Sequence, residues 1–165
     1  MGRTLQECET RPARYAVEGP ADWLVGAFLI ARREAIADVG PLDERFFLYS
    51  EEIDWCRRFG QAGWGVAHLP VIEVTHHAGR RWRGDMMAQL THSRMLFARK
   101  HYGRGRALGI RAALGLGHVV RLVVLAPRVG RLGAARERAA AEAAGLAVAL
   151  GLRRPPHGPY ARKSS

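Results

Sequence analysis

The sequence has few cysteines and no long uncharged apolar run. Among its 165 residues only Cys8 and Cys56 are cysteines, in no CxxC or CxxH pattern. This spacing argues against a disulfide framework or a zinc knuckle, and it favours a reducing, cytoplasmic compartment. The first residues lack an apolar segment of the secretory kind, so no export signal is expected. A plain membrane span, which needs roughly 18 apolar residues, is not predicted.

Acidic residues are scarce in the rear half of the chain. Residues 1–75 hold 8 Arg and 12 Asp or Glu, whereas residues 76–165 hold 18 Arg or Lys and only 3 acids. A basic half of this kind predicts an anionic partner such as lipid headgroups, diphosphates or nucleic acid. Most aromatic residues lie in the other half, and no known nucleic-acid-binding motif is present. A nucleic-acid-binding module is therefore the least favoured alternative, and no nucleic acid partner is expected.

The apolar patterning predicts an α/β chain of short mixed strands and helices. A buried strand is expected over 23–31, with Gly26 allowing a close approach, and shorter strands over 64–67 and 71–75. Helices are expected over 33–39, 50–62, 85–101, 104–126 and 133–151, with Pro127 ending the fourth. The predicted organisation is an irregular segment 1–15, a domain 16–103, a helical extension 104–151 and a flexible tail 152–165.

Three carboxylates lie within four residues where the helix over 50–62 is expected to begin. Ser50 suits the N-cap, and Glu51, Glu52 and Asp54 follow it. Acids at this end of a helix complement its dipole, which is a purely structural explanation. The same field favours an ionised carboxylate, which a general base requires. Asp54 and Arg58 are spaced i,i+4, which predicts an ion pair.

With their flanks, these residues resemble the C-terminal half of family 2 glycosyltransferases of the GT-A fold, and the rhamnosyltransferase-like members in particular. The resemblance covers about residues 15–105. Its pieces are Trp23-Leu24-Val25-Gly26-Ala27, Arg32-Arg33-Glu34, Gly40-Pro41-Leu42-Asp43-Glu44-Arg45-Phe46-Phe47, Glu51-Glu52-Ile53-Asp54-Trp55-Cys56-Arg57-Arg58, Ala62-Gly63-Trp64 and His76-His77-Ala78-Gly79. Their order and spacing together make the resemblance specific. It implies a partial GT-A domain, a nucleotide-diphospho-sugar transferase-like fold, with a C-terminal helical extension.

The resemblance implies an inverting transfer from a nucleotide-sugar donor to a lipid-linked or polysaccharide acceptor. It places the general base on Glu52, although the family usually has Asp there, and a supporting acceptor-site role on Glu51. The remaining roles are lining of the cleft by Trp23, Gly26 and Ala27, substrate binding by Asp54 and Arg58, diphosphate contacts by Arg80 and Arg81, and metal contact by His76. Core packing of Trp23, a solvated arginine loop and an ordinary polar histidine are the structural alternatives.

The resemblance also implies parts that this sequence does not contain. Relatives begin with a nucleotide-binding half that carries an Asp-x-Asp motif for a divalent metal, Mg²⁺ or Mn²⁺, and no Asp-x-Asp occurs here. We therefore expect a truncated or split enzyme whose metal is held mostly by the missing half, which a separately encoded partner could supply. The alternative is a non-catalytic scaffold remnant.

The expected helix over 104–126 has an uneven distribution of charge. Arg104, Arg111, His118 and Arg121 fall within an arc of about 100° on a helical wheel, and the rest of the surface is apolar. Such a helix suits the surface of a membrane, here the inner face of the cell membrane, where a polyprenyl-linked acceptor would lie. Packing of the same helix on the domain core is the alternative.

Overall fold

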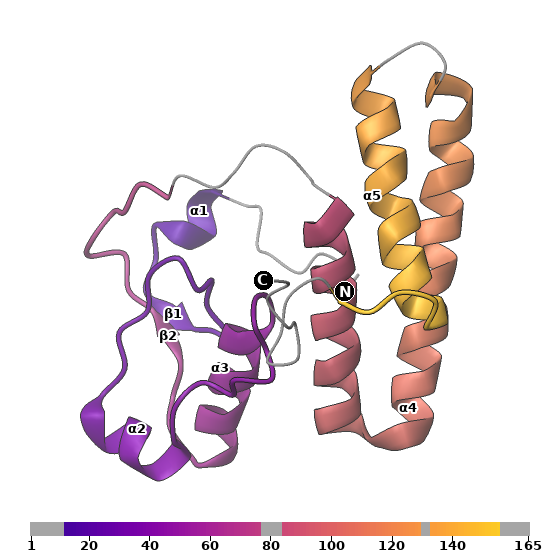
Figure 1. Ribbon diagram of the computed structural model, residues 1–165. Coiled ribbons are helices and arrows are strands. Elements are labelled where there is room, and N and C mark those ends of the chain that lie inside the picture. Colours follow the sequence, from indigo (N-terminus) through magenta and orange to yellow (C-terminus); the bar gives the residue numbers. More distant parts are fainter. Residues whose placement is uncertain (1–11, 77–83, 130–132, 156–165) are drawn as a thin grey trace, which may run out of the picture.

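The computed structural model describes residues 12–76, 84–129 and 133–155. Within these ranges the chain is mostly helical, with one small sheet (Figure 1). The elements in chain order are α1 (Pro12–Tyr15), β1 (Gly19–Pro20), α2 (Arg33–Val39), α3 (Glu51–Gln61), β2 (Ala67–His68), α4 (Gly84–Val129) and α5 (Gly133–Leu150).

A sharp bend divides the long helix α4 into two antiparallel segments. Gly103 has φ 75° and ψ 171°, a conformation that is accessible to glycine and strained for other residues. We call 84–102 the first segment and 104–129 the second segment. Small side chains let α5 pack closely against α4, with Ala88, Ala144 and Val148 buried together against Met95. The second segment and α5 form a hairpin that extends past the start of the first segment (Figure 1).

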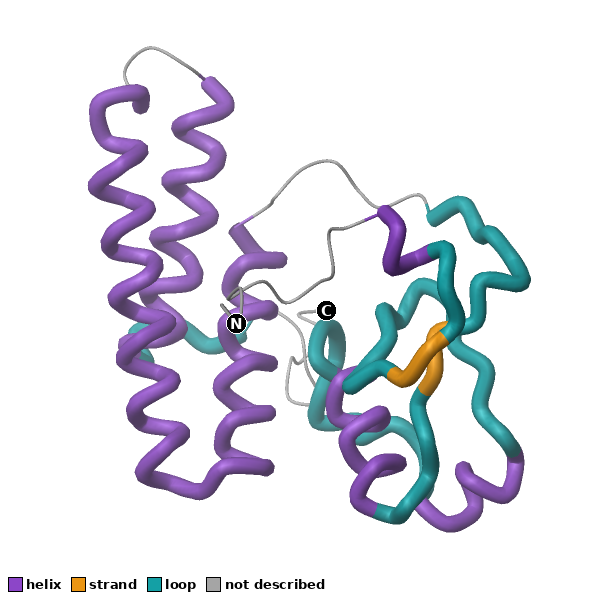
Figure 2. Tube along the Cα trace, turned by 180° about the vertical axis from the view of Figure 1, so that it is seen from behind, coloured by secondary structure: helices purple, strands orange, loops and turns teal. Residues whose placement is uncertain are grey.

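The front half, residues 12–76, lies against the first segment of α4, on the side away from the hairpin (Figure 2). Its sheet consists of two antiparallel strands of two residues each, with Gly19 opposite His68 and Pro20 opposite Ala67. The strands predicted over 23–31 and 71–75 are wrong, because both stretches are loops. Ile30 is 80% exposed and Val71 is 77% exposed. An apolar stretch becomes a buried strand only beside partner strands, which the described residues do not provide.

The helix predictions are confirmed by α2, α3, both segments of α4, and α5. Two details differ. Pro127 does not end α4, which runs on to Val129, because a proline in the last turn removes one hydrogen bond without stopping the helix. Ser50 stands at the N-cap of α3 but makes no side-chain capping hydrogen bond, since its backbone is left-handed.

A buried ionic cluster joins the front half to α4. The Asp54 side chain is 0% exposed, and its Oδ1 lies 2.6 Å from Lys100 Nζ and 2.7 Å from His101 Nε2. Lys100 also pairs with Asp43 at 2.7 Å. Nearby, Ser93 Oγ donates to the Leu48 carbonyl oxygen at 2.7 Å. These contacts hold the loop before α3 and the body of α3 against the first segment, just ahead of the bend.

Candidate functional site

The chain enters α3 through a strained turn. Tyr49 and Ser50 have φ values of 68° and 66°, so two consecutive residues with side chains adopt the left-handed conformation. Each such residue costs on the order of 1–3 kcal/mol, and strain of this kind is concentrated at functional sites. Ser50 is also buried, at 5% exposure. The turn places Glu51 and Glu52 side by side in the first turn of α3.

Both carboxyl groups of this pair are half-buried. Glu51 Oε2 and Glu52 Oε2 are each enclosed, and neither has a hydrogen-bond partner among the described residues. Burial raises the pKa of Glu51, a hydrogen bond with its own backbone opposes this in part, and the charge of the neighbouring Glu52 raises the pKa further. Buried polar atoms in native proteins are nearly always satisfied, so the two oxygens without a partner among the described residues make this pair a candidate site.

The loop over residues 22–31 covers this first turn of α3. A Cβ added to Gly26 would lie 3.5 Å from Glu52 Cβ and 3.7 Å from Glu52 Cδ, so the close approach expected at Gly26 is made by the Glu52 side chain. A second contact holds the loop against α3: the Leu24 backbone makes a hydrogen bond with Cys56, which lies one helical turn after Glu52. Burial raises the pKa of the Cys56 thiol, and the Glu52 charge adds to the shift.

The other expected cleft residues lie in the same loop. Trp23 is half-buried, whereas Gly26 and Ala27 are exposed. The structure therefore brings the loop and the carboxylate pair together, although they are separated by more than twenty residues of sequence. Gly26 is the member of the loop in contact with Glu52.

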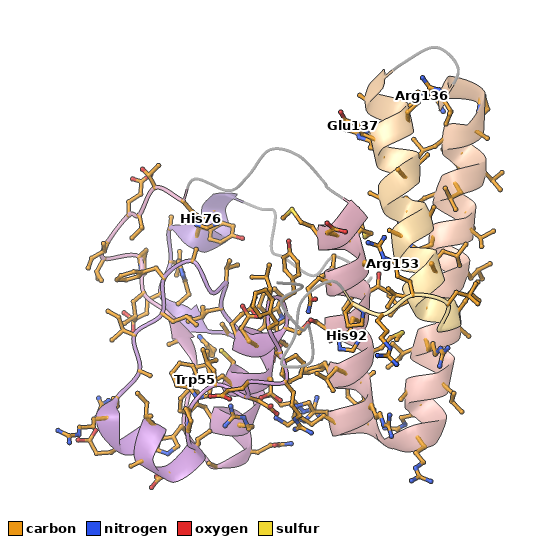
Figure 3. The ribbon with its side chains drawn as sticks, in the orientation of Figure 1. Trp55, His76, His92, Arg136, Glu137 and Arg153 are labelled. Carbon is orange, nitrogen blue, oxygen red and sulfur yellow. The ribbon has the colours of Figure 1, made fainter. Side chains whose placement is uncertain are left out.

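Asp54 and Arg58 form the predicted i,i+4 ion pair, with Arg58 Nε 2.9 Å from Asp54 Oδ2. Arg58 also donates to the carbonyl oxygens of Val39 and Pro41, at 2.8 and 2.7 Å. The neighbouring Trp55 donates to the Gly40 carbonyl at 2.9 Å, and Figure 3 shows it on the side of α3 that faces α2. The Asp54 side chain is fully buried, and the Arg58 guanidinium group is bonded to Asp54 and to two backbone carbonyl groups. This geometry supports a structural role for both side chains rather than the expected substrate contacts.

The expected metal and diphosphate contacts lie elsewhere or outside the described residues. His76 is exposed, and Figure 3 places it beside α1. Arg80 and Arg81 lie outside the described residues. Across residues 12–76, 84–129 and 133–155, no three His, Cys, Asp or Glu side chains gather as metal ligands do. His76 and the other described residues therefore do not fit a metal site.

A second buried polar cluster lies within the helical hairpin and was not foreseen from the sequence. His118 is 3% exposed. Its Nδ1 lies 2.6 Å from Glu142 Oε2, and its Nε2 lies 2.9 Å from Thr91 Oγ1. Arg121 Nη1 also reaches Glu142, at 3.2 Å. The position of His118 on the arginine-bearing stripe was the available signal, but its partners are 24 and 27 residues away.

A groove of about 510 Å³ lies over this cluster, and Glu51 and Glu52 do not line it. Its walls come from both segments of α4 and from α5, and they include Leu90, Arg94, Val120, Arg121 and Arg138. The carboxylate pair instead lies beneath the loop over 22–31. The pair combines a carboxyl group whose pKa is raised with a neighbour that has a buried oxygen without a hydrogen-bond partner among the described residues. An ionised carboxylate in such a pair can act as a general base toward a hydroxyl group that reaches it.

Comparison with known proteins relates this chain to rhamnosyltransferases. It is 38% identical over 94 residues to N-acetylglucosaminyl-diphospho-decaprenol L-rhamnosyltransferase of Mycobacterium tuberculosis, in strains CDC 1551 and H37Rv. This match covers 54% of the chain and 31% of the relative. Rhamnosyltransferase WbbL of Escherichia coli K12 is 33% identical over 57 residues, covering 34% of the chain and 22% of the relative. No family model and no solved structure matches. The similarity supports a glycosyltransferase relationship in general, and the match spans about a third of the mycobacterial relatives' length.

Proposed function

We propose that this chain forms the acceptor-side part of an inverting glycosyltransferase, of family 2 and the GT-A type, that uses a nucleotide-sugar donor. The observation that supports it most directly is the pair Glu51 and Glu52, each with a buried oxygen that lacks a partner among the described residues. The relatives' names supply the first substrates to test: an L-rhamnosyl group and an acceptor sugar on a polyprenyl diphosphate. The region that the mycobacterial relative has beyond the matched part would hold the nucleotide in the complete enzyme.

In the proposed reaction, the acceptor hydroxyl group enters beside Gly26 and transfers its proton to the Glu52 carboxylate. The acceptor oxygen then forms a bond to the anomeric carbon of the donor sugar, while the bond from that carbon to the diphosphate oxygen breaks. The electron pair of the broken bond leaves with the nucleoside diphosphate, and the anomeric configuration inverts. Glu51 supports the acceptor beside Glu52, and the loop over 22–31 keeps water away from the pair.

The test is turnover by an enzyme that contains this sequence and also the region of the mycobacterial relative that lies outside the matched 94 residues. Glu52→Gln keeps the shape of the side chain and removes the base, so we expect kcat to fall by roughly 10²–10⁴-fold with KM little changed. Glu52→Asp restores a carboxylate of the kind usual in the family and should recover part of the activity. Glu44→Gln, at an exposed carboxylate away from the pair, is the matched control.

A loss of less than about tenfold in Glu52→Gln, with Glu44→Gln unchanged, would place the base on another residue. Unchanged turnover when Glu51 and Glu52 are both replaced by Gln would favour a scaffold role, because neither carboxylate would then take part in the reaction. Circular dichroism of each variant separates a lost base from a lost fold.

A further inference from the structure

The second segment of α4 has an exposed face that is entirely apolar. At 100° per residue this face spans an arc of roughly 160°. We call it the outer face, and it consists of Leu108, Ala112, Leu116, Val119, Val120, Val123 and Val124. Leu116 and Val123 are 65% and 66% exposed. Single exposed apolar residues are ordinary, whereas a contiguous face of this length marks an interaction surface.

The structure turns the arginine stripe of the second segment toward α5, whereas the sequence had suggested that the stripe faces a membrane surface. Arg111 donates to the Ala149 carbonyl oxygen, and His118 and Arg121 meet Glu142, so the stripe holds α5. Packing on α5 therefore leaves the apolar residues uncovered. Only 11% of the most apolar 18-residue window of α4, with a mean hydropathy of 1.7, is buried. By length and composition alone, α4 could also cross a membrane.

Arginines border the outer face. Arg106 and Arg128 lie along one edge of it, near the two ends of the segment, and both are exposed. Over the described residues from 104 to 155 there are nine arginines and two glutamates. An apolar face with arginines along its edge matches a bilayer surface, because the long side chains reach the phosphates while the apolar residues sink below them.

We propose that the outer face seats this protein on an anionic membrane surface, with the second segment lying in the plane of the bilayer. Crossing is disfavoured because α5 packs along the segment, and the polar cluster of His118, Arg121 and Glu142 at the middle of the two helices would have to enter the bilayer with them. A second copy of the chain is disfavoured because residues 104–155, with nine arginines against two glutamates over the described positions, would repel a second copy of the same basic surface. The inference goes beyond the proposed sugar transfer and does not depend on it.

The test is flotation of the purified chain with vesicles of phosphatidylcholine alone or mixed with phosphatidylglycerol. We expect binding to the anionic vesicles that weakens as salt is raised. Leu116→Glu with Val123→Glu should reduce that binding by roughly tenfold or more. The matched control is Ile30→Glu with Val71→Glu, two apolar positions of the front half that are more exposed still, at 80% and 77%, and it should leave binding unchanged. Replacing Arg106 and Arg128 by Gln should weaken anionic binding by roughly fivefold per arginine.

A second measurement does not rely on the fold of the glutamate variants. A polarity-sensitive fluorophore on Val123→Cys should shift to the blue with anionic vesicles, whereas the same label on Val71→Cys should not. Absence of flotation at low salt, or flotation that the glutamate pair leaves intact, would overturn the proposal. So would a dimer in solution that the glutamate pair dissociates, since the occupant of the face would then be a second copy.

Discussion

The Asp54 cluster gives the sharpest prediction about stability. Asp54→Asn keeps the size of a side chain that is 0% exposed and removes the charge that faces Arg58, Lys100 and His101. Breaking a buried ion pair in this way typically costs about 3–5 kcal/mol. In this variant Lys100 still pairs with Asp43, and Arg58 still donates hydrogen bonds to the Val39 and Pro41 carbonyl oxygens. Neither cation is therefore left without a partner. We therefore expect the lower end of that range, about 3 kcal/mol.

The assay is urea unfolding followed by far-ultraviolet circular dichroism, with thermal unfolding beside it. For a chain of this size, about 3 kcal/mol corresponds to a fall in Tm of roughly 6–12 °C. Asp22→Asn, at an exposed acid of the front half, is the matched control and should change stability by less than about 0.5 kcal/mol. A loss below about 1 kcal/mol in Asp54→Asn would refute the assignment of the cluster as the joint between front half and α4.

The free energy of unfolding of the wild type and of Asp54→Asn should also differ in its dependence on pH. Burial alone would raise the pKa of Asp54, but hydrogen bonds from Lys100, His101 and Arg58 outweigh it and hold the pKa below its usual range. A carboxyl group whose pKa is lowered by folding stabilises the folded state above its unfolded pKa. That contribution is lost as the pH falls through the folded pKa. The stability gap between the wild type and Asp54→Asn should thus narrow in acid, below about pH 4. A gap that stays constant there would contradict the lowered pKa.

Two further predictions concern the hairpin and the thiol beside the carboxylate pair. In Gly145→Ala the new Cβ would lie 2.5 Å from His118 Cε1, so His118 must give up Thr91 or Glu142. Urea unfolding should show a loss of about 1–3 kcal/mol, while Gly60→Ala, with nothing within 4 Å, should be neutral or stabilising. In a Cys8→Ser background, Cys56 should react with iodoacetamide at least about 100-fold more slowly in the folded chain than in urea, because burial protects it and raises its pKa. Equal rates would mean that the loop over 22–31 does not cover it.

Local sequence signals predicted the helices well, because each start and stop is encoded by near neighbours. Gly40 and Pro41 end α2, and Gly63, with φ 87°, follows α3. The ion pair of Asp54 with Arg58 was foreseen for the same reason, since i,i+4 neighbours face each other. The carboxylates Glu51 and Glu52 could be singled out as a pair, but not the left-handed backbone that presents them.

Features that depend on distant partners could not be read from the sequence. The stretch over 23–31 has the composition of a strand, yet strand formation depends on neighbours that these residues lack. Lys100 and His101 lie some 47 residues from Asp54, and nothing in the local pattern marks them as its partners. The arginine stripe of α4 was visible, but a helical wheel does not tell whether polar residues face water or a second helix such as α5.

The bend at Gly103 comes two residues after His101, so the anchor of the front half and the elbow of the long helix are neighbours. A change in the angle of α4 at Gly103 would therefore change the position of the front half relative to the second segment. In the proposed membrane arrangement, the bend at Gly103 and the Asp54 cluster would together set the distance between the bilayer surface and the carboxylate pair.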